Sequence, residues 1–114
     1  MLATSLVKGG LDRPTADRYA SRATNPRAMA GPINWYRAMP FNLRRLPREV
    51  SVPTLFVWGD REMYVTRAAA EGCGKWVSAQ YRFVELPGRT HWLPTTAYED
   101  FVPPLLKHLA AASD

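Results

Sequence analysis

The chain has 114 residues, so it can form at most one small domain or part of one. Hydrophobic residues make up 46% of it, with four tryptophans, five tyrosines and four phenylalanines, and a disordered chain is excluded because this composition can bury enough apolar surface to offset chain entropy. The net charge of +5 comes from scattered basic residues without any nucleic-acid-binding motif, so we expect no nucleic-acid partner.

The first part of the chain predicts short helices that begin at prolines. One is expected over residues 14–23, with Pro14 in its first turn. The stretch "NPRAMAGPINWYRAMP" predicts two more, capped by Asn25 and Gly31, the second of which runs from Ile33 to Met39. Aromatic residues point to more than one face of that second helix, so we expect it to be enclosed.

A proline-rich break, "PFNLRRLPREVSVP", separates this helical part from the rest of the chain. Within it the basic run "RRLPR", residues 44–48, is interpreted as a solvated connector between prolines. The break therefore divides the chain into residues 1–45, helices and a linker, and residues 46–114.

The second part predicts alternating strands and helices. The apolar run "PTLFVWG", residues 53–59, is typical of a strand covered on both faces, and "QYRFVEL", residues 80–86, alternates as a second strand. The alanine-rich stretch between them predicts a short helix that ends at Gly72 and Gly74. A last helix has a capping box from Thr96 to Glu99, and two prolines at 103 and 104 should kink or delay it.

The predicted fold class is α/β, a βαβα unit with parallel strands and helices on both sides. Two parallel strands are marginal without neighbours. We therefore expect the sequence to be the end of a fold whose first strands lie elsewhere.

The loops at the ends of the two strands carry the candidate chemistry, because ligands bind beyond the carboxyl ends of parallel strands. The first loop contains Asp60 and Glu62, and the second contains His91. A histidine can take and return a proton near pH 7, and a carboxylate on its other nitrogen fixes its tautomer. Glu62 is the predicted acid, with Asp60 as the alternative. No G-x-S-x-G motif, or equivalent with aspartate, supplies a nucleophile.

These residues resemble the α/β-hydrolases, in particular the epoxide hydrolase and haloalkane dehalogenase-like branch. "VPTLFVWGDREMYV" is similar to the catalytic strand and acid loop, often G-x-x-D, and places Glu62 at the acid's position. "LPGRTHWLP" is similar to the histidine loop, often G-x-x-H-W, and places His91 and Trp92. "GPINWYRAMP" resembles the end of the cap domain, which implies that Tyr36 protonates the epoxide oxygen and that Trp35, with Trp92, lines the substrate pocket.

The resemblance implies that residues 1–45 are a remnant of the cap domain and linker, and that residues 46–114 are the C-terminal part of the hydrolase core. The expected parent is an epoxide hydrolase that acts on a small apolar substrate through a covalent ester. The chain alone should be inactive because the nucleophile is missing. Two alternatives stay open: a serine esterase as parent, or a non-catalytic chain that associates through its open sheet edge.

The remaining features predict a cytoplasmic protein without metal or cofactor. Cys73 is the single cysteine, so it can form no intramolecular disulfide, and it has no companions at metal-ligand spacing. The N-terminus lacks the pattern of a signal peptide, and no apolar run approaches the roughly 20 residues that span a bilayer, so no membrane association is expected.

Overall fold

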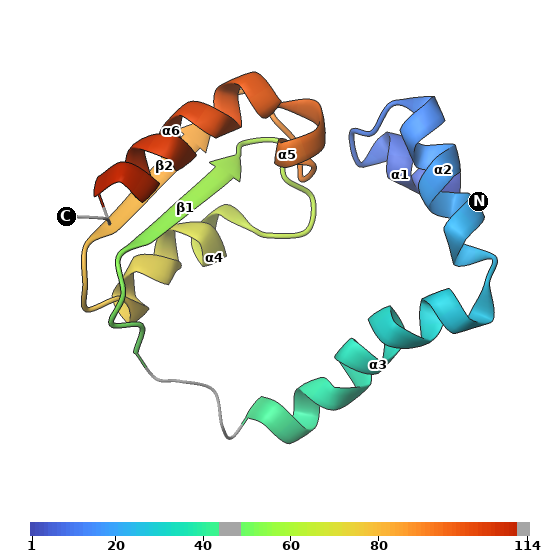
Figure 1. Ribbon diagram of the computed structural model, residues 1–114, viewed down its shortest axis with the longest axis horizontal. Helices are drawn as coiled ribbons and strands as arrows, with labels where there is room; N and C mark the ends of the chain where they lie inside the picture. The colour runs from blue at the N-terminus through green and yellow to red at the C-terminus, as the bar shows by residue number, and fades with distance from the viewer. Residues whose placement is uncertain (44–48, 112–114) are drawn as a thin grey trace. The chain divides into compact units, whose positions relative to one another are not determined.

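A computed structural model describes residues 1–43 and 49–111 of the chain, which divides into two compact units, residues 1–48 and residues 49–114 (Figure 1). The predicted connector at 44–48, and with it the predicted boundary between residues 45 and 46, lies outside the described residues.

The first unit consists of helices α1 (Leu2–Lys8), α2 (Arg13–Ala23) and α3 (Pro26–Asn42). The predicted helix at 14–23 is confirmed as α2. Its N-cap is Asp12, whose carboxylate accepts the Thr15 N–H at 2.9 Å, as expected where a helix start leaves N–H groups unpaired. Among the described residues of this unit, Leu11 and Ala16 are the buried hydrophobic residues, and Thr15 is buried beside them in sequence. Helix α1 was not predicted from the sequence.

The prediction of two short helices between residues 25 and 39 is wrong, because α3 is continuous from Pro26 to Asn42. Pro32 lies inside it and removes one backbone N–H donor, but the helical hydrogen bonds on either side do not depend on that donor. Gly31 precedes this proline and has no Cβ to clash with the ring, which eases the restriction that normally ends a helix there. Gly31 is therefore a helix-interior residue and not a cap.

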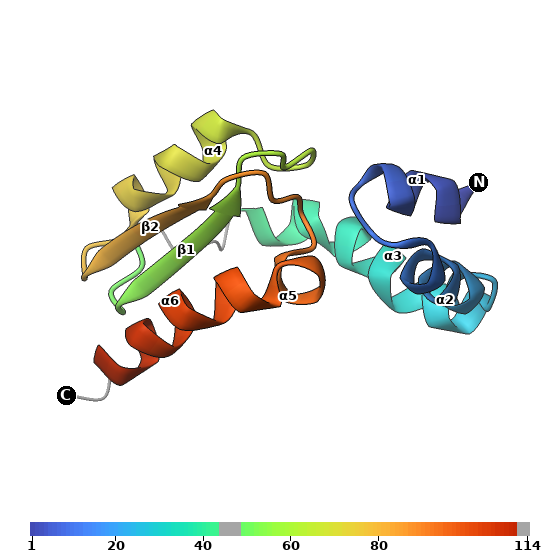
Figure 2. The ribbon, with the colours of Figure 1, turned by 90° about the horizontal axis from the view of Figure 1, so that it is seen from above.

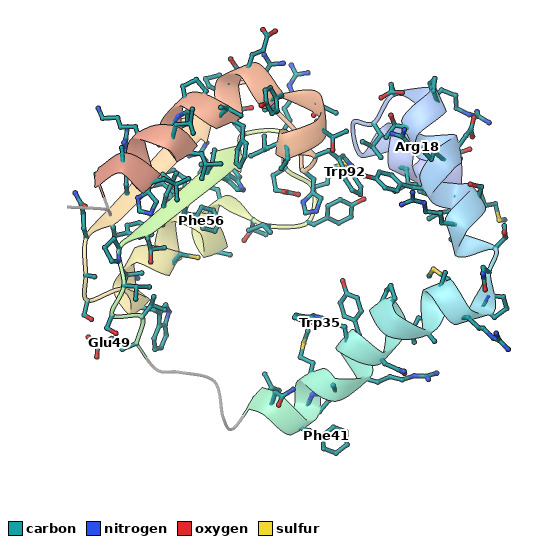
Figure 3. All side chains as sticks on the ribbon, in the orientation of Figure 1. Arg18, Trp35, Phe41, Glu49, Phe56 and Trp92 are labelled. Atoms are coloured by element: carbon teal, nitrogen blue, oxygen red, sulfur yellow. The ribbon has the colours of Figure 1, made fainter. Side chains whose placement is uncertain are left out.

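The expectation that this helix is enclosed is also wrong for the chain as described. None of the residues of α3 is buried, and Trp35 and Phe41, labelled in Figure 3, are 75% and 81% exposed. An apolar helix that faces water on several sides is unusual for a complete globular domain.

The second unit is built on a parallel pair of strands, β1 (Thr54–Gly59) and β2 (Tyr81–Leu86). Both predicted strands and their parallel pairing are confirmed, with Phe56 opposite Phe83 and Gly59 opposite Leu86. Between the strands run α4 (Arg67–Gly72) and the 3₁₀ turn η2 (Cys73–Trp76). Figure 2 shows α4 on one face of the sheet and α5 (Leu93–Thr96) with α6 (Tyr98–Ala111) on the other.

A small core lies between the sheet and α5–α6. Alternate strand residues share a face, and those on the α6 side pack with the two helices. This core consists of Val57, Val84, Leu86, Leu93, Ala97 and Phe101. Among the described residues no large side chain is fully buried, so this core is thin.

The predicted capping box at Thr96 is wrong. Thr96 is the last residue of α5, and its hydroxyl donates to the Trp92 carbonyl at 3.0 Å instead of capping the following helix. Helix α6 begins at Tyr98 and contains both Pro103 and Pro104, so the prolines do not delay its start.

Candidate active site

The candidate site is formed by two loops at the carboxyl ends of the paired strands. We call residues 60–66, after β1, the acid loop, and residues 87–92, after β2, the histidine loop. Because Gly59 and Leu86 are the last paired residues of two parallel strands, the loops leave the sheet side by side. Figure 1 shows both arrowheads at the end of the sheet next to α5.

Glu62 and His91 meet across these loops. Glu62 Oε2 lies 2.7 Å from His91 Nδ1, although 29 residues separate them in sequence. The Glu62 side chain is only 7% exposed, whereas that of His91 is 40% exposed. Glu62 is therefore not a solvated loop acid, and its carboxylate sits behind a ring that solvent or a substrate can reach.

The surroundings of Glu62 favour its ionised form. Burial raises its pKa, but the hydrogen bond from the Tyr64 N–H, at 2.6 Å, and the hydrogen bond and charge interaction with His91 outweigh burial, so the pKa lies below the ordinary glutamate value. An ionised carboxylate can only accept, which means that Nδ1 of His91 must be the donor. Nε2 of the neutral ring then carries the lone pair, as a general base requires.

Two aromatic side chains flank the imidazole. Trp92 lies edge-on to His91 with ring centroids 5.3 Å apart, and Tyr64 lies edge-on at 4.8 Å. Sequence reasoning named Trp92 but missed Tyr64. The signal that could have found it is its place on the acid loop, two residues after Glu62. Tyr64 is 58% exposed, so the histidine lies beside aromatic surface that remains accessible.

The backbone of the acid loop also contacts the end of β2 and the histidine loop. The Asp60 N–H donates to the Leu86 carbonyl at 3.3 Å, and the Arg61 N–H donates to the Arg89 carbonyl at 2.9 Å. Asp60, the alternative acid, does not contact His91 in this arrangement: its Oδ1 accepts the Gly88 N–H at 2.6 Å. Of the two acids, the structure brings Glu62 to the histidine.

The other two predicted site residues, Tyr36 and Trp35, lie on α3 in the first unit. Both are exposed, at 71% and 75%. Their roles in proton donation and substrate binding stay predictions.

Neither a metal cluster nor a membrane span is present in the described part of the chain. Over residues 1–43 and 49–111 no group of three or more histidine, cysteine, aspartate or glutamate side chains could hold a metal ion. Cys73 donates to the Ala69 carbonyl at 3.3 Å, a contact within its own helical turn. No helix over the same residues is long and apolar enough to cross a bilayer.

Paired parallel strands with an acid loop and a histidine loop at their carboxyl ends are the arrangement expected of an α/β-hydrolase. Comparison with curated proteins agrees with this class. The chain is 30% identical over 86 residues to epoxide hydrolase 3 of Mus musculus, which covers 75% of the chain and 23% of that protein. It is 30% identical over 93 residues to epoxide hydrolase 4 of Homo sapiens, which covers 80% of the chain and 26% of that protein.

Epoxide hydrolase 3 of Xenopus tropicalis is 25% identical over 87 residues, 76% of the chain and 24% of that protein. No family model matches the chain, and no solved structure matches it. The chain spans about a quarter of the length of the curated relatives it matches. The resemblance predicted from the sequence is confirmed: the chain is homologous to epoxide hydrolases and corresponds to the C-terminal part of an α/β-hydrolase.

Proposed function

We propose that this chain supplies the acid–base half of an epoxide hydrolase active site, with His91 as the general base and Glu62 as the acid that orients it. The observation that carries the proposal is the 2.7 Å contact between Glu62 Oε2 and His91 Nδ1. It gives the ring the tautomer that a base needs, in a chain whose relatives are named as epoxide hydrolases.

In the proposed reaction an aspartate from a segment outside this sequence attacks one ring carbon of the epoxide. The carbon–oxygen bond breaks, and Tyr36 donates its phenolic proton to the leaving oxygen, which leaves a hydroxy ester and a tyrosinate. The phenol suits this role because its ordinary pKa of about 10 keeps it protonated at neutral pH.

Hydrolysis of the ester then uses His91. Nε2 takes a proton from water, and the hydroxide attacks the ester carbonyl. The departing alkoxide takes the proton back from the imidazolium to form the diol, and the new carboxylic acid returns its proton to the Tyr36 tyrosinate. One water is consumed for each epoxide, and every residue ends as it began.

The strand pair and the thin core of the second unit support the proposal that β1 and β2 are part of a larger sheet. A parallel pair of strands usually has neighbours on both sides, and here no large side chain within the described residues is fully buried. We infer that residues 46–114 belong to the hydrolase core, where β1 and β2 pair with further strands, and that residues 1–45 belong to its cap and linker. Aromatic residues beside the base, Tyr64 and Trp92, favour a small apolar substrate.

The first test uses the purified 114-residue chain with an aryl epoxide and a p-nitrophenyl ester. We expect turnover of neither. Turnover of either substrate that is lost in His91→Ala would contradict the proposal that the nucleophile lies elsewhere. The in-frame DNA upstream of Met1 is then read for a nucleophile elbow motif. An elbow with aspartate supports an epoxide hydrolase, and an elbow with serine supports the esterase alternative. The absence of any elbow supports a non-catalytic chain that associates through its sheet edge.

The second test asks whether Glu62 and His91 can support catalysis when the rest of an epoxide hydrolase is present. In a chimera, this chain replaces the matching quarter of mouse epoxide hydrolase 3. We expect the chimera to hydrolyse an aryl epoxide and His91→Ala to abolish turnover, with Glu71→Gln, a change at an exposed glutamate of α4, as the matched control. A folded chimera whose turnover is unaffected by His91→Ala would overturn the assignment of the base.

A further inference from the structure

The two acids of the acid loop bind different parts of the histidine loop. Asp60 Oδ1 accepts the Gly88 N–H at 2.6 Å, while Glu62 Oε2 contacts His91 Nδ1 at 2.7 Å. We propose that Asp60 is a positioning residue, which fixes the histidine loop against the acid loop and so keeps His91 within reach of Glu62. The inference rests on the proposed function, since it concerns the geometry of the same acid–histidine pair.

The contacts of Asp60 lie immediately before the pair along both loops. Its backbone N–H binds the Leu86 carbonyl, and the next residue, Arg61, binds the Arg89 carbonyl. These contacts end one residue before Glu62 and two residues before His91. Any change in the separation of the loops at Asp60 is therefore passed to the pair with little chain in between to absorb it.

The Gly88 N–H is held at a point where the chain turns sharply. Gly88 has a φ of 72°, in the left-handed region that favours glycine, and it follows Pro87, which has no N–H of its own. The Asp60 carboxylate holds this turn against the acid loop by accepting the Gly88 N–H. A hydrogen bond to an ionised acceptor is shorter and roughly twice as strong as one between neutral groups. A carboxylate therefore holds the Gly88 N–H more strongly than a neutral acceptor would.

Side-chain length explains why the two acids are not interchangeable. Aspartate is short enough to bind the backbone of the adjacent loop, and the extra methylene of glutamate lets Glu62 bind a ring further along that loop. A small movement of the histidine loop would break the Glu62–His91 hydrogen bond, because such a bond is lost when its length grows much beyond about 3.5 Å. Asp60 is itself exposed, so we expect its removal to affect position more than stability.

The experiment reads the tautomer of His91 by ¹⁵N NMR of the ring nitrogens in the full 114-residue chain. His108, the second histidine, is assigned with His108→Gln. We expect the Nδ1–H tautomer in the unsubstituted chain, its loss in Glu62→Gln, and the same loss in Asp60→Ala. Asp60→Asn keeps an oxygen acceptor and should give an intermediate result. Asp17→Ala, at an exposed aspartate of α2, is the matched control and should change nothing.

The outcomes separate this inference from the proposed function. If Asp60→Ala keeps the tautomer of the unsubstituted chain, Asp60 does not position the histidine, and the Glu62–His91 pair stands. If the unsubstituted chain itself lacks the Nδ1–H tautomer, the pair and both proposals fail. Should Asp60→Ala not fold, Asp60→Asn decides, together with the amide signal of Gly88, which must shift if the contact is lost. In the chimera, Asp60→Ala should lower kcat about 10²-fold with little change in KM.

Discussion

Gly59, the last residue of β1, lies directly against the backbone carbonyl of Arg89 in the histidine loop. A Cβ atom at residue 59 would overlap that carbonyl oxygen and its carbon, which are main-chain atoms that cannot rotate away. The absence of a side chain at this position therefore lets the acid loop and the histidine loop leave the sheet in contact. It is a packing requirement, independent of any special backbone conformation of the glycine.

Gly59→Ala should consequently destabilise the chain by about 3 kcal/mol, the upper range for overpacking a close contact. Thermal unfolding followed by circular dichroism measures the loss. Gly72→Ala is the matched control: it ends α4 with an ordinary helical backbone and nothing within 4 Å of the added atom. That substitution should stabilise the chain by up to about 1 kcal/mol. Equal effects of the two substitutions would contradict the close approach of the loops.

The strands could be predicted because their signals are strong and local, and the approach of the acid loop to the histidine loop follows from the parallel pairing of those strands. The run "PTLFVWG" is apolar throughout and bounded by proline and glycine, which favours a buried strand over the alternatives. Once two strands are placed in parallel, general rules of α/β sheets put Glu62 and His91 at one edge.

Other features depend on information that the sequence does not carry locally. The pair Gly31–Pro32 has the composition of a helix start, yet the surrounding helix continues through it. Thr96 offers a capping side chain, yet its hydroxyl binds a carbonyl of the preceding turn. The choice between Asp60 and Glu62 depends on the exact separation of two loops, which spacing along the chain alone cannot give.

Glu62→Gln should lower the rate of epoxide hydrolysis by the chimera about 10²- to 10⁴-fold. The neutral amide no longer stabilises the imidazolium, and its NH₂ group can hold the ring in the wrong tautomer. Steady-state kinetics measures the loss, with Glu71→Gln as the control because that glutamate is 55% exposed and forms its ion pair with Arg67, away from the histidine. A double variant with His91→Ala should be no slower than His91→Ala alone, since the two residues act as a unit.

Acidification should remove the stability that the pair contributes. The pKa of Glu62 is lower in the folded chain than in the unfolded chain, so the unfolded state binds more protons as the pH falls. The contribution is complete above the ordinary glutamate pKa of about 4.3 and is lost as the pH falls through the lowered pKa of the folded state. Urea unfolding between about pH 7 and pH 2 measures it. The stability difference between the unsubstituted chain and Glu62→Gln should shrink over this window; a constant difference would mean that ionisation of Glu62 contributes nothing.

Tyr36 and His91 should control different steps of the proposed reaction, and this separates them in the chimera. Tyr36→Phe removes the proton donor for ring opening, so formation of the ester slows while its hydrolysis does not. His91→Ala removes the base for the second step, so the ester accumulates after one rapid ring opening. Rapid quenching followed by intact-protein mass spectrometry distinguishes the two, because only His91→Ala should show an added mass equal to that of the epoxide. Accumulation of the ester in Tyr36→Phe would place Tyr36 in the hydrolytic step instead. Unchanged kinetics would mean that Tyr36 only packs against the substrate, a role that Phe fills equally well.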